Sequence, residues 1–446
     1  MNRQSQTQTE RDEQIYQLTT LVAGEFSLPE VLERLAEAAV KIVNVKACSI
    51  RLLDEETNDL KMRSSYGLSE EYQSKGVVSR HDPVIKAAFA GEAIVIDDMR
   101  LDPQVKYRDA AAKEGLVSQL TVVMKFRNQP VGVLRLYSPE PKHFNKADIK
   151  LARAVASQCA VAIVNARFYN EALEGAKMAE QMRLAGLIQR RMIPEDIPQL
   201  PGIELAATYI PCFDVGGDLY DFLPLGHHRL AVVIADVIGK GMPAAMMMSW
   251  LKGVVRTHTD TFQFALEGPR QEKTRAERIG ASEAFVRQAV QKFNRMSCRE
   301  CKIGEFITLF YAILDSKTKS LTYCSCGHEP TVLIRGHETR DLDTGGLVLG
   351  VDRSAAYEIE TLELTDGDCV LFYTDGLIDA VNFDEELWGR ERLLAAAQKG
   401  VACSAEHIVK NILRYRRRFS GLARQIDDTS VIVAKVGKSD DCHCEG

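Results

Sequence analysis

The sequence lacks the features that mark a membrane, secreted or nucleic-acid-binding protein. No apolar run approaches the length of a membrane-spanning helix. The N-terminal stretch MNRQSQTQTERDEQ is polar and lacks the apolar core of a signal peptide. The formal net charge is −6, so the composition offers no general electrostatic attraction for nucleic acid. We therefore expect a cytoplasmic protein that binds neither membrane nor nucleic acid.

Cysteine is too sparse for a disulfide framework, with 11 residues in a chain of 446. Three close pairs raise the alternative of a zinc site: Cys298/Cys301, Cys324/Cys326 and Cys442/Cys444. Their spacings, CREC, CSC and CHC, differ from one another, and CSC lies in an expected strand. We interpret these residues as ordinary thiols, although the CHC tail has the side chains for weak metal binding.

The remaining composition is that of a soluble globular protein of two or three domains, with 46% hydrophobic and 26% charged residues. Asn145 is the expected N-cap of a long helix, with Asp148 three residues on. The other elements that hydrophobic periodicity predicts in this first part are two helices within 12–44, strands over 48–54 and 60–67, a short helix over 81–91, a strand over 93–96, and a hairpin of strands over 120–126 and 131–137.

This order of elements resembles a GAF domain over residues 15–170. The most specific part is the segment QLTVVMKFRNQPVGVLRLYSPEPKHFNKADIKLARAVASQCAVAI. The resemblance implies a sensory or dimerising module with an antiparallel sheet and helices, and no set of residues identifies its ligand. Cys48, Cys159 and His81 offer a redox or haem alternative, but we interpret them as buried core cysteines and a surface histidine.

The long helix continues as a linker. Small residues step by alternating threes and fours, as in a coiled-coil seam. They are Ala152, Val155, Cys159, Ala162, Ala166, Tyr169, Leu173 and Ala176. We expect the first half of this seam to pack on its own domain. Residues 171–195 then form a helical linker that pairs two chains into a homodimer, and Pro194 and Pro198 end it.

A further domain is expected over 196–437, where short strands alternate with helix pairs. This pattern favours an α+β fold over a parallel α/β sheet. The polar segment 263–280 is expected to be a surface loop. Strands are predicted over 203–210, 229–236, 306–315, 321–325, 331–335, 369–375 and 430–436, and helices over 243–258, 281–296, 390–398 and 405–419.

Several aspartates of this domain stand where an apolar strand meets a turn. They are Asp218, Asp236, Asp375, Asp427 and Asp428. One such acid is usually a turn former or a helix cap. Converging carboxylates repel one another and need protons or a cation to coexist. Oxygen ligands select hard ions such as Mg²⁺ or Mn²⁺, and the histidine and thiolate set of catalytic zinc is missing.

Five motifs occur in a recognisable order: DVGGDLYDF, ADVIGKGMPAAMMM, CGHEP, YTDGLIDAVN and DDTSVIV. Together with the leading segment LIQRRMIPEDIP, they look like the PPM-type metal-dependent serine/threonine phosphatases, in the bacterial SpoIIE/RsbU branch. The resemblance covers about residues 190–436. It implies a β-sandwich flanked by helices.

The resemblance also implies residue roles. Asp218 would be an acid at the metal centre. Asp236 would bridge two metal ions, with the Val237 carbonyl as a further ligand, and Asp375 and Asp427 would complete one ion's shell. The role of Asp428 stays open.

Other residues of the motifs have supporting interpretations. Gly216 and Gly217 mark a bulge or a close backbone approach, and we expect them to let a strand bend so that Asp218 reaches the metal centre. Gly239 and Gly241 would let the backbone turn beside the site. Lys240 is expected to be exposed and receives no catalytic role. His328 is interpreted as a structural residue at a strand end, with a proton donor as the alternative.

The implied chemistry is hydrolysis of phosphoserine or phosphothreonine. Two Mn²⁺ or Mg²⁺ ions would lower the pKa of a shared water, and the hydroxide would attack phosphorus in line. By the same resemblance, the substrate would be a phosphorylated anti-anti-sigma protein of the STAS class. The GAF domain would regulate the phosphatase through the linker.

The sequence departs from the family pattern at three places. Cys326 replaces alanine in CGH, Ser430 replaces threonine in DDTS, and the loop near 260–280 is longer. No proposed ligand is lost, so we expect an active enzyme. The alternatives are a catalytically silent scaffold; a diguanylate cyclase, for which Leu219 and Tyr220 are wrong after GGD; and a tyrosine phosphatase, for which no reactive cysteine loop is found.

Overall fold

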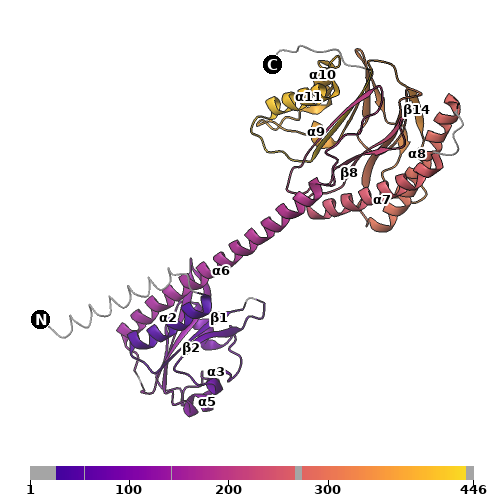
Figure 1. The fold of residues 1–446 in the computed structure, drawn as a ribbon. Coiled ribbons are helices and arrows are strands. Elements are labelled where there is room, and N and C mark those ends of the chain that lie inside the picture. Colours follow the sequence, from indigo (N-terminus) through magenta and orange to yellow (C-terminus); the bar gives the residue numbers. More distant parts are fainter. Residues whose placement is uncertain (1–26, 55, 142, 267–273, 438–446) are drawn as a thin grey trace. The chain divides into compact units, whose positions relative to one another are not determined.

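The computed structural model describes residues 27–54, 56–141, 143–266 and 274–437. The first of the two helices expected within 12–44 and the CHC tail lie outside these ranges. The chain divides into two compact units between Lys177 and Met178 (Figure 1). Within the described ranges, we find no helix that combines the length and the apolar character needed to cross a membrane.

The first unit is built on a five-stranded antiparallel sheet of order β2-β1-β5-β4-β3. The expected strands and the hairpin are confirmed, and the short helices α3 and α5 are additional. The elements are α2 (Leu28–Val43), β1 (Ala47–Leu53), β2 (Leu60–Tyr66), α3 (Glu70–Gln73), α4 (Pro83–Phe89), β3 (Ile94–Ile96), α5 (Arg108–Lys113), β4 (Ser118–Phe126), β5 (Gln129–Ser138) and the start of α6 (Lys146–Arg190).

The two faces of this sheet differ in character because successive residues of a strand point to opposite sides. Ile50, Leu134 and Leu136 pack on one face against α2 and the first turns of α6. The other face carries polar residues, which are buried beneath the segments that contain α3, α4 and α5. The sheet therefore has an apolar helical side and a polar loop-covered side.

Helix α6 begins as its sequence predicts. The Asn145 side chain accepts hydrogen bonds from the backbone N–H of Ala147 and Asp148, and Asp148 accepts one from the backbone N–H of Asn145. The small-residue seam is buried in the first unit at its beginning, including Val155. Farther along, Tyr169 is 70% exposed. The first half of the seam thus packs on its own domain, as expected.

The second unit consists of two packed sheets with helices outside them. One sheet has the order β13-β10-β9-β8-β7, with β14 paired to β10, and the other has the order β12-β11-β15-β16-β6. The elements are β6 (Ile203–Ile210), β7 (Leu219–Pro224), β8 (Arg229–Val237), α7 (Met242–Leu266), α8 (Arg275–Glu300), β9 (Ile307–Asp315), β10 (Ser320–Cys326), β11 (Thr331–Arg335), β12 (Glu338–Leu342), β13 (Gly345–Gly346), β14 (Glu360–Glu363), β15 (Cys369–Tyr373), α9 (Asp375–Ile378), α10 (Gly389–Gln398), α11 (Ala405–Ser420) and β16 (Thr429–Val436).

The core of this unit lies between the sheets, where Phe310 of β9 and Phe372 of β15 meet with ring centroids 5.5 Å apart. Helices α7 and α8 cover the first sheet, and α10 and α11 cover the second (Figure 1). Apolar runs such as RLAVVIAD are buried on both faces for this reason. The predicted α+β class, with a β-sandwich flanked by helices, is confirmed.

The predicted surface loop over 263–280 is shorter than expected. Helix α7 extends to Leu266, and α8 begins at Arg275. The first turns of α8 are polar because they are exposed, which hid them from the hydrophobic pattern. A capping box in which Thr274 and Glu277 bond each other's backbone N–H stabilises this start.

Candidate functional site

Asp218 and Asp236 are brought together by the pairing of β7 with β8. Leu219 pairs with Ala235, so the residues that flank this pair lie at one end of the ladder. Asp218 is 1% exposed. Its Oδ2 accepts hydrogen bonds from Thr374 Oγ1 at 2.7 Å and Ser430 Oγ at 2.8 Å, which reach it from the second sheet. The two sheets therefore meet at this carboxylate.

The pKa values of this pair are raised by their surroundings. Burial raises the pKa of Asp218 well above its usual range, and the neighbouring Asp236 adds to the shift. Burial, followed by repulsion from Asp375 and Asp427, raises the pKa of Asp236 to about 7. Four acids from distant parts of the chain thus act on one another through space, as the sequence predicts for converging carboxylates.

Asp375 opens α9 directly after β15, and burial together with Asp427 and Asp379 raises its pKa. Asp379 was not predicted as a site residue. Burial and Asp427 raise its pKa also. Its position four residues after Asp375 in YTDGLIDA puts both on one face of a helical turn, which is the signal that could have revealed it.

The chemistry of the donors fits a hard divalent cation. Carboxylates whose pKa values are raised by mutual repulsion regain their charged form when a cation lies between them. Within the described residues, no three His, Cys, Asp or Glu side chains already stand at the spacing of a formed metal site.

Lys240 has a closer relation to the cluster than its motif indicated. Its Nζ lies 2.7 Å from Asp427 Oδ2, while the side chain stays 45% exposed. An exposed ion pair of this kind contributes little to stability. It does place an ammonium group beside Asp427.

The glycine pair before Asp218 corrects one expectation. Gly216 and Gly217 lie in the loop before β7 rather than within a strand, and neither has a positive φ. A Cβ at Gly216 would meet Asp428 Oδ2 at 2.2 Å and the Tyr209 hydroxyl at 2.3 Å. A Cβ at Gly217 would meet the Val237 carbonyl oxygen at 2.9 Å. Glycine is therefore required at both positions because neighbouring groups approach the backbone closely, which was the other interpretation of the motif.

Asp428 holds this loop. Its Oδ2 accepts a hydrogen bond from the Gly217 N–H at 2.7 Å, and its Oδ1 accepts one from the Cys212 N–H at 2.8 Å. Both carboxylate oxygens are thereby engaged by backbone. We assign Asp428 a positioning role for the loop that carries Asp218.

Gln189, near the end of α6, forms hydrogen bonds to the same loop, and the sequence did not predict it as a site residue. Its side-chain amide donates to the Gly216 carbonyl at 2.7 Å, and its Oε1 accepts from the Gly216 N–H at 2.9 Å. The residue is 5% exposed. Nothing in LIQRRM marks this glutamine, because a two-way amide contact depends on the tertiary fold.

His328 is 6% exposed, and burial lowers its pKa to about 4, so the ring is neutral at physiological pH. Its Nδ1 lies 2.8 Å from Thr308 Oγ1, and that hydroxyl donates to the Asp236 carbonyl oxygen at 3.3 Å. His328 thus lies behind the end of β8, where it supports the backbone of Asp236.

Comparison with known families places these residues in context. Residues 226–437 match the family model of Stage II sporulation protein E (SpoIIE), and residues 26–164 match the model of the GAF domain. The chain carries a GAF domain followed by a SpoIIE domain. Asp236, Asp375 and Asp427 lie inside the matched SpoIIE segment, and Asp218 lies before it.

Curated relatives match about half of the chain. Protein IcfG of Synechocystis sp. is 28% identical over 226 residues, which cover 49% of this chain and 36% of IcfG. Phosphoserine phosphatase RsbU of Bacillus subtilis is 26% identical over 238 residues, which cover 53% of this chain and 64% of RsbU. The chain therefore spans only part of the length of either curated relative.

A solved structure of the RsbU and RsbW domains of Rv1364c from Mycobacterium tuberculosis is also similar. It has 25% sequence identity and a TM-score of 0.45, and the match covers 56% of this chain and 64% of that chain.

Proposed function

We propose that the SpoIIE domain is a metal-dependent phosphatase that hydrolyses phosphoserine or phosphothreonine on a protein. The observation that carries this proposal is the convergence of Asp218, Asp236, Asp375 and Asp427, which come from the ends of four strands and whose charges, in addition to burial, raise the pKa values of the first three. Similarity to a named phosphoserine phosphatase adds support. The domains are proposed to span 15–170, 171–195 and 196–437.

We assign five residues to a centre for two Mn²⁺ or Mg²⁺ ions: Asp218, Asp236, Asp375, Asp427 and the carbonyl of Val237. Bound ions of this kind supply Lewis acidity and lower the pKa of coordinated water, so no protein nucleophile is required. The chain's own contribution would be to hold these oxygens in place.

The supporting residues position the ligands. Thr374 and Ser430 fix one oxygen of Asp218, which leaves the other oxygen to face Asp236 and a cation. Asp428 and Gln189 hold the preceding loop through hydrogen bonds to the backbone of Gly217 and Gly216. Lys240 pairs with Asp427, so a divalent ion held by that carboxylate would compete with the ammonium group for it.

The proposed substrate is a small phosphorylated regulator of the STAS class in a sigma-factor pathway. We also propose that the GAF domain regulates the phosphatase through α6, and that residues 171–195 pair two chains into a homodimer. These points rest on family resemblance and on the exposed apolar residues of α6 such as Leu173, which is 42% exposed.

The deciding experiment is hydrolysis of p-nitrophenyl phosphate or a phosphoserine peptide with Mn²⁺, with Mg²⁺ and with EDTA. Asp236→Asn and Asp375→Asn should each reduce the metal-dependent rate by more than the roughly 10–100-fold typical of residues that only support a ligand. Asp366→Asn is the matched control, because Asp366 is an exposed acid of the same unit that pairs with Lys319.

Turnover that survives EDTA, or that persists in both ligand variants, would contradict the site. Mn²⁺ binding without turnover on any phosphopeptide would favour the catalytically silent scaffold instead.

A further inference from the structure

A cavity of about 370 Å³ lies in the second unit, beside the acidic cluster. It is enclosed by the second half of α11, the loop 421–425, the residues that follow α9 and the end of β6. Three arginines line it: Arg416, Arg417 and Arg424. No acidic side chain stands among the described residues that line it, so the cavity is positively charged.

Arg416 lies on the buried face of an amphipathic helix. Residues four apart lie above one another on a helix, and Ile412, Arg416 and Ser420 of α11 form such a row. Ile412 is fully buried, as expected for the face that packs on the sheet. The row then continues with two polar residues, at positions where an amphipathic helix would carry apolar ones. Burying polar groups there is costly unless they find a partner.

The polar atoms of this row do not find one within the protein. Arg416 Nε and Ser420 Oγ are buried, and neither has a hydrogen-bond partner in the ranges that the structure describes. Arg416 Nη2 donates one long hydrogen bond, to the Gly376 carbonyl oxygen at 3.4 Å. Burial lowers the pKa of Arg416, which indicates a charge that its surroundings do not compensate. Buried donors without partners call for a ligand that accepts hydrogen bonds.

The position of these arginines near the C-terminus of α11 explains part of their presence, because cations are favourable at that end of a helix. It does not explain why they lack acidic neighbours. Lys410 of the same helix pairs with Glu406, whereas the three arginines of the cavity form no ion pair with any acid that the structure describes. Their charges are therefore available to a ligand.

The cavity borders the proposed metal centre at two places. The Gly376 carbonyl group, which accepts the hydrogen bond from Arg416, belongs to the residue that follows Asp375. Gln425 lines the cavity, and its side-chain amide donates to the Asp427 carbonyl oxygen at 2.7 Å. An extended peptide spans about 3.3 Å per residue. A side chain a few residues from a phosphoserine at the metal centre can therefore reach the cavity.

Exposed apolar side chains flank the same cavity. Leu422 is 91% exposed and lies in the loop 421–425. Phe383 is 73% exposed, and its ring lies 3.6 Å from the point that a Cβ on Gly421 of the cavity wall would occupy. Apolar surface beside a charged pocket is typical of a protein interface, whereas a free anion would have no use for it. The occupant is therefore expected to be part of a polypeptide.

We propose that this cavity is a specificity site of the phosphatase, which binds an acidic side chain near the phosphorylated residue of the protein substrate. The carboxylate lies against Arg416 and Arg417, and neighbouring residues of the substrate contact Leu422 and Phe383. A guanidinium group offers paired donors that match a carboxylate. This inference rests on the proposed function, because it assumes that the phosphorylated residue is held at the metal centre.

The test compares two phosphoserine peptides, one with glutamate on both sides of the phosphoserine and one with glutamine at the same positions. Values of kcat/KM are measured with Mn²⁺ at about 0.15 M salt, where exposed charges more than about 8 Å apart are largely screened. We expect the wild type to prefer the glutamate peptide about tenfold, and Arg416→Gln to reduce this preference to about twofold or less.

The matched control is Arg418→Gln. Arg418 is exposed on the same helix and does not line the cavity, so this variant should keep the wild-type preference. The ratio of the two kcat/KM values is the quantity compared, because a general loss of activity leaves that ratio unchanged. Circular dichroism checks that each variant folds. If Arg416→Gln is unfolded, Arg417→Gln takes its place, because Arg417 is exposed at the rim of the cavity.

A binding measurement separates this inference from the proposed function. The same two peptides with unphosphorylated serine cannot be hydrolysed, and their binding in the presence of Mn²⁺ is followed by fluorescence anisotropy. The glutamate peptide should bind the wild type more tightly than the glutamine peptide, and Arg416→Gln should remove the difference. Free glutarate at the peptide's concentration should not compete, because it lacks the residues that contact the apolar rim.

The two ideas then fail in different ways. If p-nitrophenyl phosphate and both phosphopeptides are left intact while binding still depends on Arg416, the proposed function is wrong and the acidic peptide site stands. If p-nitrophenyl phosphate is hydrolysed without any preference for glutamate, the specificity site is wrong and the phosphatase stands. Equal effects of Arg416→Gln and Arg418→Gln, or competition by free glutarate as strong as that by the peptide, would also overturn the specificity site.

Discussion

At the scale of single residues, the sequence identifies the acids of the site but not the groups that hold them. Asp218 and Asp236 are visible because each stands between an apolar strand and a glycine-rich turn. Thr374 and Ser430 are 156 and 212 residues away from Asp218 along the chain. A hydroxyl group has no local signature for such a contact, because only the packing of two sheets creates it.

Ser430 gives a prediction at this scale. Ser430→Ala removes one of two hydrogen bonds to a buried carboxylate, so Mn²⁺ affinity should fall about tenfold, as for residues that support metal ligands. Calorimetric titration with Mn²⁺ measures it. Ser430→Thr keeps the hydroxyl group and should retain the wild-type affinity. Equal affinity in all three proteins would show that the hydrogen bond does not position Asp218.

At the scale of elements, the expected strands are predicted to within a residue or two, and so are the helices α10 and α11, whereas the start of α8 is not. β6 begins and ends where its pattern indicates, at Ile203 and Ile210. The first turns of α8 are too polar for a periodicity argument. The run TRAE, from Thr274 to Glu277, is nonetheless a capping-box signature and would have revealed the start of that helix.

The end of α6 carries the second prediction. Gln189→Leu leaves the buried N–H and carbonyl groups of Gly216 without partners, which costs about 1–3 kcal/mol per group. We expect the metal-dependent rate to fall about tenfold as the loop that carries Asp218 loosens. Gln181→Leu is the control, because Gln181 is exposed on the same helix. An unchanged rate in Gln189→Leu would contradict the role assigned to the hydrogen bonds between Gln189 and Gly216.

The attachment of α8 to its sheet carries the third prediction. Asp315 at the end of β9 pairs with Arg229 of β8 at 2.9 Å and with Arg278 of α8 at 2.8 Å. Burial alone would raise the pKa of Asp315, but the hydrogen bonds from Arg278 and Arg229 outweigh it and lower that pKa. Asp315→Asn should reduce the free energy of unfolding by about 3 kcal/mol at neutral pH.

The pH dependence of that loss has a definite sign. A carboxylate whose pKa is lower in the folded than in the unfolded state stabilises the folded protein at pH values above the unfolded-state pKa. This contribution is lost as the pH falls through the folded-state pKa. The difference between the wild type and Asp315→Asn should therefore hold from about pH 7 to about pH 5 and shrink below about pH 4. Both tryptophans, Trp250 and Trp388, lie in the second unit, so their fluorescence during urea unfolding reports on it. A difference that grows in acid would contradict the lowered pKa.

At the scale of the whole molecule, α6 serves both units. Its early residues are buried in the first unit, and Gln189 is buried in the second. A fragment that begins at residue 196 therefore lacks the side chain that bonds the backbone of Gly216. From the sequence, the boundary between the linker and the second domain was expected at Pro194 and Pro198. Prolines indicate where a helix ends, but they do not indicate which unit its last turns pack against.

This supplies the fourth prediction. A fragment of residues 178–446 should retain the metal-dependent hydrolysis rate of the full chain in the absence of a signal. In a fragment of residues 196–446, this rate should fall by at least the factor expected for Gln189→Leu. Rates with p-nitrophenyl phosphate and Mn²⁺ measure the difference. Circular dichroism confirms that both fragments are folded. Equal rates in the two fragments would show that α6 contributes nothing to the site.

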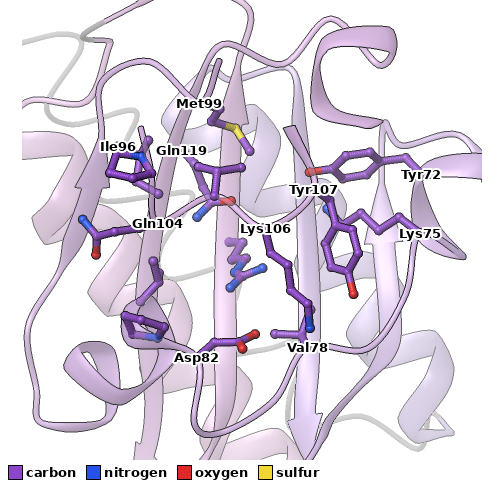
Figure 2. A pocket seen from close by; sticks show the side chains of 15 residues that line it. Tyr72, Lys75, Val78, Asp82, Ile96, Met99, Gln104, Lys106, Tyr107 and Gln119 are labelled. Carbon is purple, nitrogen blue, oxygen red and sulfur yellow. The ribbon is translucent and has the colours of Figure 1, made fainter. Parts of the chain in front are cut away.

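Strand β5 has a property that follows from its alternating side chains. Arg135 lines a cavity on the loop-covered side of the first unit's sheet (Figure 2), while its neighbours Leu134 and Leu136 pack beneath α2 and the first turns of α6. Arg135 and the two leucines share one strand backbone, so a displacement of the guanidinium would also act on the packing at the start of the long helix. In this strand, a residue of the polar face and a residue that contacts the long helix are separated by a single peptide bond.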